Sequence, residues 1–324
     1  MSEASVIRRA IERGVAFLES AQLSSGEIPI EISPNADMSG DSVREPVVFP
    51  TAVAARALSI TPLAANIRAR ALDFLLREME ADGLWRHPSS DKPGHDDTPL
   101  DLDDTSIASA ALKAAGRPFP DNRALILAER EPNGLFRTWI VRWWSRPLMT
   151  YRFFRYVAKP HDVDAVVNAN VVIYLGIRKE TRPAIEHMLA VLRDHREMAS
   201  TIWYGSIFTV WYFFSHALLE IAPEAGAMIV PRLEAAAPGN ALELSLATST
   251  LLLWNRVPDV EALIEAQLPS GGWPNAGFYH MGFRAGDAQP KPPWWGSEAL
   301  TAVFAVEALS RRMAWSVSRG NSET

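Results

Sequence analysis

Apolar residues recur along this chain at the three- and four-residue spacing of amphipathic α-helices. We find no sustained alternation of apolar and polar residues, the pattern that would indicate strands. Short amphipathic patterns that end at a small turn cover 16–22, 74–79 and 263–267. After a polar loop, a second and more apolar helical pattern follows each of them. These second patterns start near Phe49, Asp103, Asp164, Trp203, Asn240 and Trp295.

The turns that end the first patterns repeat as well. They lie at Ser25-Gly26, 82–85, 133–136 and 270–273, and the last three end in Trp or Phe. The repeat unit of about 50 residues is within the range of repeat architectures. We therefore expect helical hairpins, each with a polar outer helix and an apolar inner helix. About six hairpins would close into an all-α fold, a single (α/α)6 barrel or toroid with its inner helices around a cavity.

The composition is typical of one globular unit. Hydrophobic residues make up 48% of the 324 residues and charged residues 22%, which is enough for a substantial core. Because no stretch of linker-like composition divides the chain, 1–324 is predicted to be a single domain. The formal net charge of -6 argues against nucleic acid as a partner.

Three features bear on the compartment. The chain has no cysteine, which removes disulfides and thiolate zinc sites and fits a reducing environment. Residues 1–14 are charged and lack the apolar core of a secretory signal, so a cytoplasmic location is expected. The apolar stretch 199–221 is long enough to span a membrane. Its aromatic content fits a buried helix beside an apolar cavity better.

Asp101, Asp103 and Asp104 fall within four positions, directly before an apolar, Ala-rich run. Carboxyl groups this close together cannot all ionise without cost, so one of them can keep its proton near neutral pH. Helix capping is the ordinary role of such acids, and it accounts for one or two of them. Three acids, with Asp96 and Asp97 just upstream, favour a reaction that begins by protonating a very weak base.

The string DLDDTS at 101–106 resembles the DxDD(T/S) motif of class II terpene cyclases, the group that includes squalene–hopene cyclases. The turns at 83–85 and 267–273 are similar to the Gln-Trp repeats of that superfamily. The resemblance covers most of the chain as a repeat pattern and is sharp only at the acidic string. Because the chain has room for one barrel, it resembles the monodomain class II cyclases of bacterial meroterpenoid pathways.

This resemblance implies a protonation-initiated cyclisation of a polyprenyl or meroterpenoid substrate. The middle aspartate, Asp103, would protonate a terminal alkene or epoxide, with Asp101 and Asp104 on either side of it. No cofactor is then required, because the acid is a side chain, and Mg²⁺ would accompany only a diphosphate substrate. Aromatic faces would stabilise the positive charge that moves through the folded chain.

Aromatic residues are the candidates for the wall of the cavity. Most aromatic side chains at helical spacing belong to a core, and a few near the starts of inner helices are expected to face the substrate. Those expected to contact a lipophilic isoprenoid are Phe49, Trp203, Tyr204, Trp211, Tyr279 and Trp295.

A partner for the acid is expected from the next repeat. There Asp164 takes the position of Asp103 and Ala165 that of the following acid, so we expect no second acid site, although Asp164 remains a candidate substrate contact. Asparagine on an apolar helix must be hydrogen-bonded. Either Asn168 or Asn170 is expected to orient Asp103, unless it caps a neighbouring element instead.

Arginines interleave with Trp and Phe between Phe136 and Tyr156, at positions 137, 142, 146, 152 and 155. They could form an amphipathic patch on a membrane surface, bind a carboxylate or diphosphate head group, or face solvent. We favour the first interpretation, a peripheral membrane contact where a lipophilic substrate dissolves. The sequence leaves the oligomeric state open.

Three other functions are alternatives. Asp96, Asp97 and Asp101 could hold Mg²⁺ in a class I prenyl diphosphate cyclase, although a second metal motif is not evident. An α/α-barrel glycoside hydrolase would pair Asp103 with Glu298 or Asp164, against the apolar excess of the inner helices. A non-catalytic isoprenoid-binding helical-repeat protein would bind the ligand without turnover.

Overall fold

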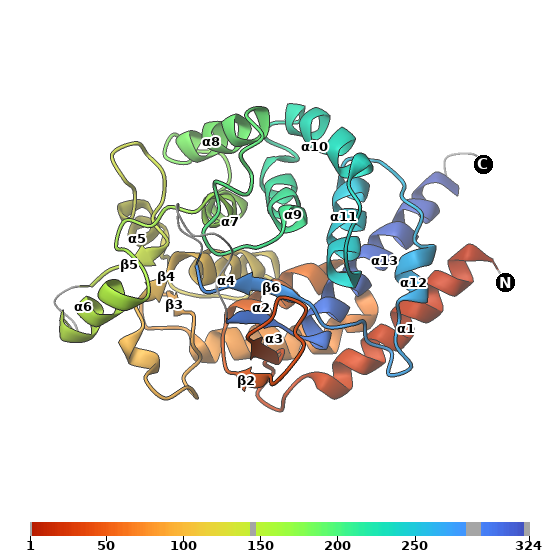
Figure 1. Cartoon of the computed structure of the whole chain (residues 1–324), viewed down its shortest axis with the longest axis horizontal. Coiled ribbons are helices and arrows are strands. Elements are labelled where there is room, and N and C mark those ends of the chain that lie inside the picture. Colours follow the sequence, from red (N-terminus) through yellow and green to blue (C-terminus); the bar gives the residue numbers. More distant parts are fainter. Residues whose placement is uncertain (1, 143–146, 283–292, 321–324) are drawn as a thin grey trace.

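The computed structural model describes residues 2–142, 147–282 and 293–320, which form thirteen α-helices and two small sheets. Six largely apolar helices occupy the middle of the molecule (Figure 1): α2 (Phe49–Ala57), α4 (Leu102–Ala114), α7 (Ala165–Leu175), α9 (Ile207–Leu218), α11 (Ala241–Leu253) and α13 (Glu298–Gly320). Six more lie outside them: α1 (Glu3–Ala21), α3 (Ala65–Glu78), α5 (Arg123–Ala128), α8 (Arg182–Arg193), α10 (Glu224–Ala235) and α12 (Glu261–Glu265). A further helix, α6 (Pro147–Tyr156), projects at one end.

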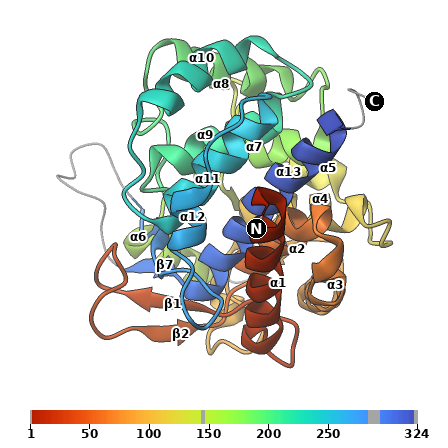
Figure 2. The same cartoon turned by 90° about the vertical axis from the view of Figure 1, so that its right-hand side faces the viewer.

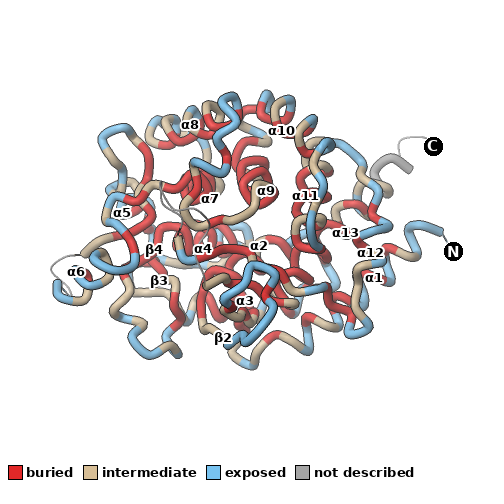
Figure 3. Tube along the Cα trace, viewed as in Figure 1, coloured by how far each residue is buried: buried red, intermediate tan, exposed pale blue. Residues whose placement is uncertain are grey.

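The inner helices contact one another in chain order. α2 contacts α4, α4 contacts α7, and the series continues through α9, α11 and α13 back to α2. The outer helices α1, α3, α8, α10 and α12 pack on α13, α2, α7, α9 and α11 respectively. Burial follows this division, since the inner helices are almost wholly buried and the outer ones alternate between buried and exposed residues (Figure 3). The predicted mainly helical fold and its apolar inner helices are confirmed.

The turns recognised in the sequence share one backbone geometry. At Gly26, Gly83, Gly134 and Gly271 the glycine N–H donates to the carbonyl three residues earlier, and all four have positive φ. Two of the following tryptophans also match, because Trp85 Nε1 donates to Leu75 O at 2.8 Å and Trp273 Nε1 donates to Leu263 O at 2.7 Å. Glycine adopts a left-handed backbone without strain, which explains its recurrence in these turns.

Two sheets depart from the all-α prediction. One has the order β2-β1-β7-β6 and is built from β1 (Ile30–Ser33), β2 (Val43–Glu45), β6 (Gly277–His280) and β7 (Trp294–Gly296). The other has the order β3-β4-β5 and is built from β3 (Trp85–Arg86), β4 (Leu100–Asp101) and β5 (Trp139–Ile140). These strands have two to four residues each, too few to show a period of two in the sequence. β4 and β7 lead almost directly into α4 and α13, so each sheet lies at the N-terminal end of an inner helix. Figure 2 shows β1, β2 and β7 of the four-stranded sheet side by side.

The apolar stretch 199–221 contains the helix α9, which is only 12 residues long and mostly buried. Within the part of the chain that the structure describes, no helix has both the length and the apolar character needed to cross a bilayer.

A buried polar cluster joins α9 to α13. Glu307 accepts hydrogen bonds from Tyr212 Oη at 2.8 Å and from Arg311 Nη2 at 2.7 Å, and its side chain has no exposure to solvent. His216 Nε2 lies 3.7 Å from the same carboxylate. Burial, with the charges of Arg56 and Arg311, lowers the pKa of His216 well below its usual range, so this imidazole is neutral. The cluster thus links the two helices through buried hydrogen bonds.

Replacing Glu307 should test this cluster. We expect Glu307→Ala to lower the free energy of unfolding by about 3 kcal/mol, because it leaves Arg311 and the Tyr212 hydroxyl without their buried partner. Urea unfolding measures the change. Glu186→Ala on the exposed face of α8 is the control and should shift stability by less than about 0.5 kcal/mol. Equal midpoints for the two variants would show that the cluster adds nothing to stability.

Candidate active site

Asp101 begins the acidic string as the N-cap of α4. Its Oδ1 accepts hydrogen bonds from the backbone N–H groups of Asp103, at 2.7 Å, and Asp104, at 3.3 Å. Strand pairing holds the residue from both sides, since Asp101 pairs with Trp85 on β3 and with Trp139 on β5. Capping therefore explains one of the three aspartates and leaves Asp103 and Asp104 without a capping role.

The same cap recurs at α7 and corrects the predicted repeat register by two positions. Asp164 Oδ1 accepts from the backbone of Val166 at 2.7 Å and of Val167 at 3.3 Å, as Asp101 does one repeat earlier. Asp164 is thus the counterpart of Asp101 rather than of Asp103. Val166 and Val167 take the places of Asp103 and Asp104 in the α7 repeat. Of these two repeats, only the one that contains α4 has acids after the capping aspartate.

Asp103 lies between two hydrogen-bond donors. Asn170 Nδ2 on α7 donates to Oδ1 at 2.6 Å, and the Tyr204 hydroxyl donates to Oδ2 at 2.5 Å. The residue is 7% exposed. Burial raises the pKa of Asp103 to about 7, and the two donors oppose that rise. The carboxyl group therefore retains its proton up to near-neutral pH, beside groups that stabilise its conjugate base.

Asp104 faces a different partner, His87. The His87 Nδ1 atom is 3.2 Å from Asp104 Oδ2, and the Tyr279 hydroxyl is 3.3 Å from His87 Nε2. Asp104 Oδ1 is buried and makes no hydrogen bond. Burial raises the pKa of Asp104 well above its usual range. Burial also lowers the pKa of His87, and the charges of Asp101 and Asp103 partly oppose that decrease. For Asp101, burial and the charges of Asp104 and Asp103 raise the pKa as well.

A cavity of about 270 Å³ opens beside these acids. Its wall is mostly apolar and aromatic, and the described residues that line it come from loops, both sheets, the starts of inner helices and helix α6. They are Glu45, Phe49, His87, Pro88, Lys92, Thr98, Asp101, Asp103, Asp104, Thr138, Trp139, Phe153, Val157, Trp203, Tyr204, Tyr279, His280, Met281 and Trp295.

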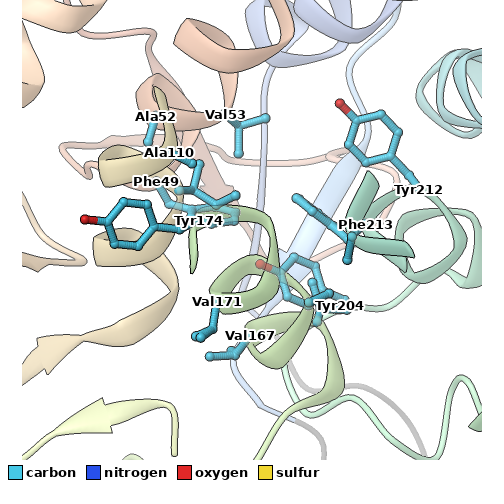
Figure 4. Packing of buried hydrophobic residues seen from close by; sticks show 14 of the residues in the cluster. Phe49, Ala52, Val53, Ala110, Val167, Val171, Tyr174, Tyr204, Tyr212 and Phe213 are labelled. Atoms are coloured by element: carbon cyan, nitrogen blue, oxygen red, sulfur yellow. The ribbon is translucent and has the colours of Figure 1, made fainter. Parts of the chain in front are cut away.

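Several aromatic rings of the wall pack against one another near Asp103. Tyr279 stacks on Trp295 with ring centroids 5.2 Å apart, and Phe49 lies 6.2 Å from Tyr204 and 5.9 Å from Tyr279. Tyr204 also packs on Phe213 at 5.8 Å, a contact visible in Figure 4. Such a wall presents π faces, which attract cations and contain no strong nucleophile.

The structure gathers five of the six predicted aromatic residues at this cavity. Phe49, Trp203, Tyr204, Tyr279 and Trp295 line it, and Asp101, Asp103 and Asp104 lie in its wall. Of the two asparagines, Asn170 contacts Asp103, whereas Asn168 bonds to the backbone of Phe136 and Asp164.

Two other predicted residues lie elsewhere. Trp211 points its indole N–H at Glu197, 3.1 Å away, with Arg232 over the ring. Asp164 is occupied by backbone N–H groups and by the Thr201 hydroxyl. Neither lines the cavity. Trp211 faces Arg232 on the outer helix α10, and Asp164 caps α7 and binds Thr201. Their predicted role as substrate contacts therefore has no geometric basis.

The arginines divide into separate groups. Arg137 pairs with Glu129 and Arg142 with Asp82, so each has a structural partner. Arg152 and Arg155 are exposed on α6. Arg146 lies outside the described residues. These positions do not form one head-group site within the described part of the chain.

The alternative acid sets remain dispersed. Asp96 and Asp97 lie on the 3-10 turn η3 (His95–Asp97) at the surface, away from the buried cap Asp101. Across residues 2–142, 147–282 and 293–320, no three His, Asp or Glu side chains are arranged to hold a metal ion. Glu298 accepts from the Ser270 hydroxyl and does not line the cavity that Asp103 faces.

Sequence reasoning missed several residues that line the cavity. His87, Lys92 and Trp139 all line the cavity, and none belongs to the acidic string or to an inner helix. A lone histidine or lysine in a loop has no distinguishing pattern. Only Trp139 had a signal, its place among the aromatic residues after the third turn.

Comparison with known proteins supports the fold. No protein-family model matches the chain, and no curated protein matches its sequence. Among solved structures, a protein from Actinoplanes matches with a TM-score of 0.70, at 18% identity over 95% of this chain and 99% of that one. A ligand-free variant of the type II terpene cyclase MstE from Scytonema matches with a TM-score of 0.72, at 16% identity over 96% and 98%.

A further structure of the Scytonema enzyme contains geranylgeranyl dihydroxybenzoate as its substrate. It matches with a TM-score of 0.71, at 16% identity over 96% of this chain and 99% of that one. Identities this low establish the fold alone. At the level of fold and over almost the whole chain, the protein is similar to a monodomain class II meroterpenoid cyclase, as the sequence predicted.

Proposed function

We propose that this protein is a class II terpene cyclase built as a single (α/α)6 barrel, which cyclises a polyprenyl or meroterpenoid substrate by protonation. The observation that carries the proposal is the set of contacts around Asp103. A buried carboxyl group, with a pKa near neutrality, lies between Asn170 and Tyr204 at the edge of an aromatic cavity. Neither capping nor packing requires such a group.

In the first step Asp103 transfers its proton to the terminal alkene or epoxide of the folded substrate. The carboxyl O–H bond breaks, and for an alkene a C–H bond forms from the π electrons, leaving a carbocation. Asn170 and Tyr204 donate to both oxygens of the new carboxylate, which lowers the free energy of that ion. Each ring then closes when the next double bond attacks the cation, and loss of a proton ends the reaction. No atom is gained or lost, so the reaction is an isomerisation.

Phe49, Trp203, Tyr204, Tyr279 and Trp295 have the role of cation stabilisers in this mechanism. Attraction of a cation to a desolvated aromatic face is worth about 2 kcal/mol. We assign His87 as a positioning residue, since it contacts Asp104 and Tyr279 rather than the acid itself. The charge of Asp104 raises the pKa of Asp103, so the pairing of His87 with Asp104 acts on the acid through electrostatics.

The cavity and the structural neighbours support the proposed substrate class. The Scytonema enzyme binds a geranylgeranyl dihydroxybenzoate, and a mostly apolar cavity whose lining also includes polar residues fits a prenyl chain with a polar head group. Lys92, paired with Glu45, is a charged side chain in this lining. The acid is a side chain, so no cofactor is needed, and Mg²⁺ would enter only with a diphosphate head group. Because such substrates dissolve in lipid, we also propose peripheral contact with a membrane.

Asp103→Asn should abolish cyclisation. We expect a loss of at least about 10³-fold in kcat, since general acid catalysis is worth about 10²–10⁴ and protonation here initiates the whole reaction. The assay incubates the protein with farnesyl- and geranylgeranyl-bearing hydroquinones and benzoates and measures products by mass spectrometry. Asp41→Asn, an exposed change of the same kind, is the control.

The same assay separates the alternatives. Full activity in EDTA is expected for a class II enzyme with these substrates, whereas a class I enzyme would lose turnover of a prenyl diphosphate. Activity on an oligosaccharide alone would favour the glycoside hydrolase. Ligand binding without any product would favour the non-catalytic protein, and cyclised product from Asp103→Asn would refute the assignment of the acid.

The raised pKa of Asp103 predicts a pH-dependent gain in stability for Asp103→Asn. The carboxyl ionises near pH 4 in the unfolded chain and at about pH 7 in the folded one. As the pH rises between these values, the unfolded state releases its proton first, so the wild-type protein loses stability. The variant escapes this loss, and its advantage should grow to about 4 kcal/mol above pH 7. Urea unfolding at pH 4.5 and 8 measures it, and a constant difference would contradict the raised pKa.

The two asparagines form a matched pair of variants. Asn170→Ala should lower kcat by about tenfold or more and move the high-pH limb of the activity profile upward, because Asp103 loses a donor that favours its ionised form. Asn168→Ala should destabilise the fold by about 1–3 kcal/mol, through its lost bonds to Phe136, without moving that limb. The reverse result would show that Asn168 serves the acid.

A further inference from the structure

Helix α6 exposes large apolar side chains to solvent. Tyr156 is 80% exposed, Leu148 59% and Tyr151 58%, and all three lie on this one ten-residue helix. Large apolar side chains gathered on the surface of one element mark a site that binds a partner or a membrane. Figure 1 shows α6 at the far end of the molecule, beside β5.

The exposed face of α6 is also basic. Arg152 and Arg155 are exposed between the tyrosines, and Lys159 follows one turn beyond. The stretch 147–160 contains no Asp or Glu, although the whole chain has a formal net charge of -6. The adjoining turn η3 carries Asp96 and Asp97, so the basic character belongs to the outward face of α6 and not to this whole end of the molecule.

The opposite face of α6 belongs to the cavity. Phe153 on α6 and Val157 directly after it line the cavity, and the Phe153 ring lies 4.8 Å from Trp139 in an edge-on contact. One short helix thus has a solvent-exposed face with tyrosines and arginines and an inward face that forms cavity wall. A molecule held against the outward face would be within one helix diameter of the cavity.

We propose that the outward face of α6, made of Leu148, Tyr151, Arg152, Arg155 and Tyr156, docks on an anionic lipid surface and so brings the cavity entrance to the bilayer. Arginine pairs with lipid phosphates, and tyrosine, with an apolar ring and a polar hydroxyl, concentrates at the headgroup level. The inference rests on the proposed function, because only a lipophilic substrate gains from this position.

The positive charge of the outward face favours a lipid surface over a protein partner. Stable protein interfaces have buried cores that are poor in charge and bury roughly 800 Å² on each partner. The outward face of α6 belongs to a helix of only ten residues and carries two exposed arginines, Arg152 and Arg155, so it is too small and too basic for such a core. A short amphipathic helix with basic and aromatic residues is instead the form that interfacial anchors take.

Flotation with vesicles tests the docking without any turnover. The full-length protein is mixed with vesicles of phosphatidylcholine alone or with 30 mol% phosphatidylglycerol, in about 0.1 M and about 0.5 M salt. We expect binding to the anionic vesicles that weakens at high salt. Arg152→Glu with Arg155→Glu should lower the partition coefficient by about tenfold or more, since each basic side chain near an anionic surface contributes severalfold.

A control with the same change in charge is Arg193→Glu with Arg196→Glu, at the exposed end of α8, and it should bind as the wild type does. Tyr156→Ser, a change at a highly exposed position that leaves the fold intact, should also weaken binding. Each variant is checked by its unfolding midpoint and by its activity on detergent-solubilised substrate, which should be unchanged.

The outcomes separate this inference from the proposed function. Failure of the wild-type protein to bind anionic vesicles, or equal loss in the α6 and α8 variants, would refute the docking face while leaving the cyclase proposal intact. Absence of cyclisation in detergent would refute the cyclase proposal alone. Wild-type binding that falls only in the α6 variants, with detergent activity retained, establishes the docking face.

Discussion

The proposed chemistry depends on how one carboxyl group, that of Asp103, is kept uncharged in a buried and largely apolar environment. Asp103 is buried, and burial favours its neutral form, while Asn170 and Tyr204 favour the ion. These opposing effects bring the pKa close to neutral, where an acid is available in its protonated state and still able to release its proton. Stronger donors would leave Asp103 ionised, and deeper burial without donors would keep the proton bound.

Asp101 makes this arrangement available. By accepting the N–H groups of Asp103 and Asp104, it satisfies the start of α4 and relieves those residues of capping. The side chains of Asp103 and Asp104 then point to separate partners, Asn170 with Tyr204 on one side and His87 on the other. Three adjacent acids thus have three distinct environments. The matching cap at Asp164, with valines in the places of Asp103 and Asp104, shows the same helix start without the two further acids.

The two small sheets connect the scaffold to the site. β4 ends at Asp101, β6 and β7 carry Tyr279 and Trp295, and an isolated bridge joins Tyr279 to Tyr204. Residues of the wall are therefore fixed by backbone hydrogen bonds and not only by side-chain packing. A rigid wall suits a reaction in which a carbocation must meet the next double bond before it meets water.

The sequence by itself determined the helical hairpins, their glycine turns, the acidic string and most of the aromatic wall, because each is a local pattern with a fixed spacing. It could not determine which asparagine reaches Asp103, because Asn168 and Asn170 lie on one helix and only the packing of α7 against α4 selects between them. It missed His87. It also aligned Asp164 with Asp103 instead of with Asp101, because the alignment of the repeats depends on helix caps, in which side chains bind backbone N–H groups. The sheets were missed for a related reason: strands of two to four residues gain their pairing from distant segments. Tertiary structure alone brought those segments together and thereby decided the surroundings of the acid.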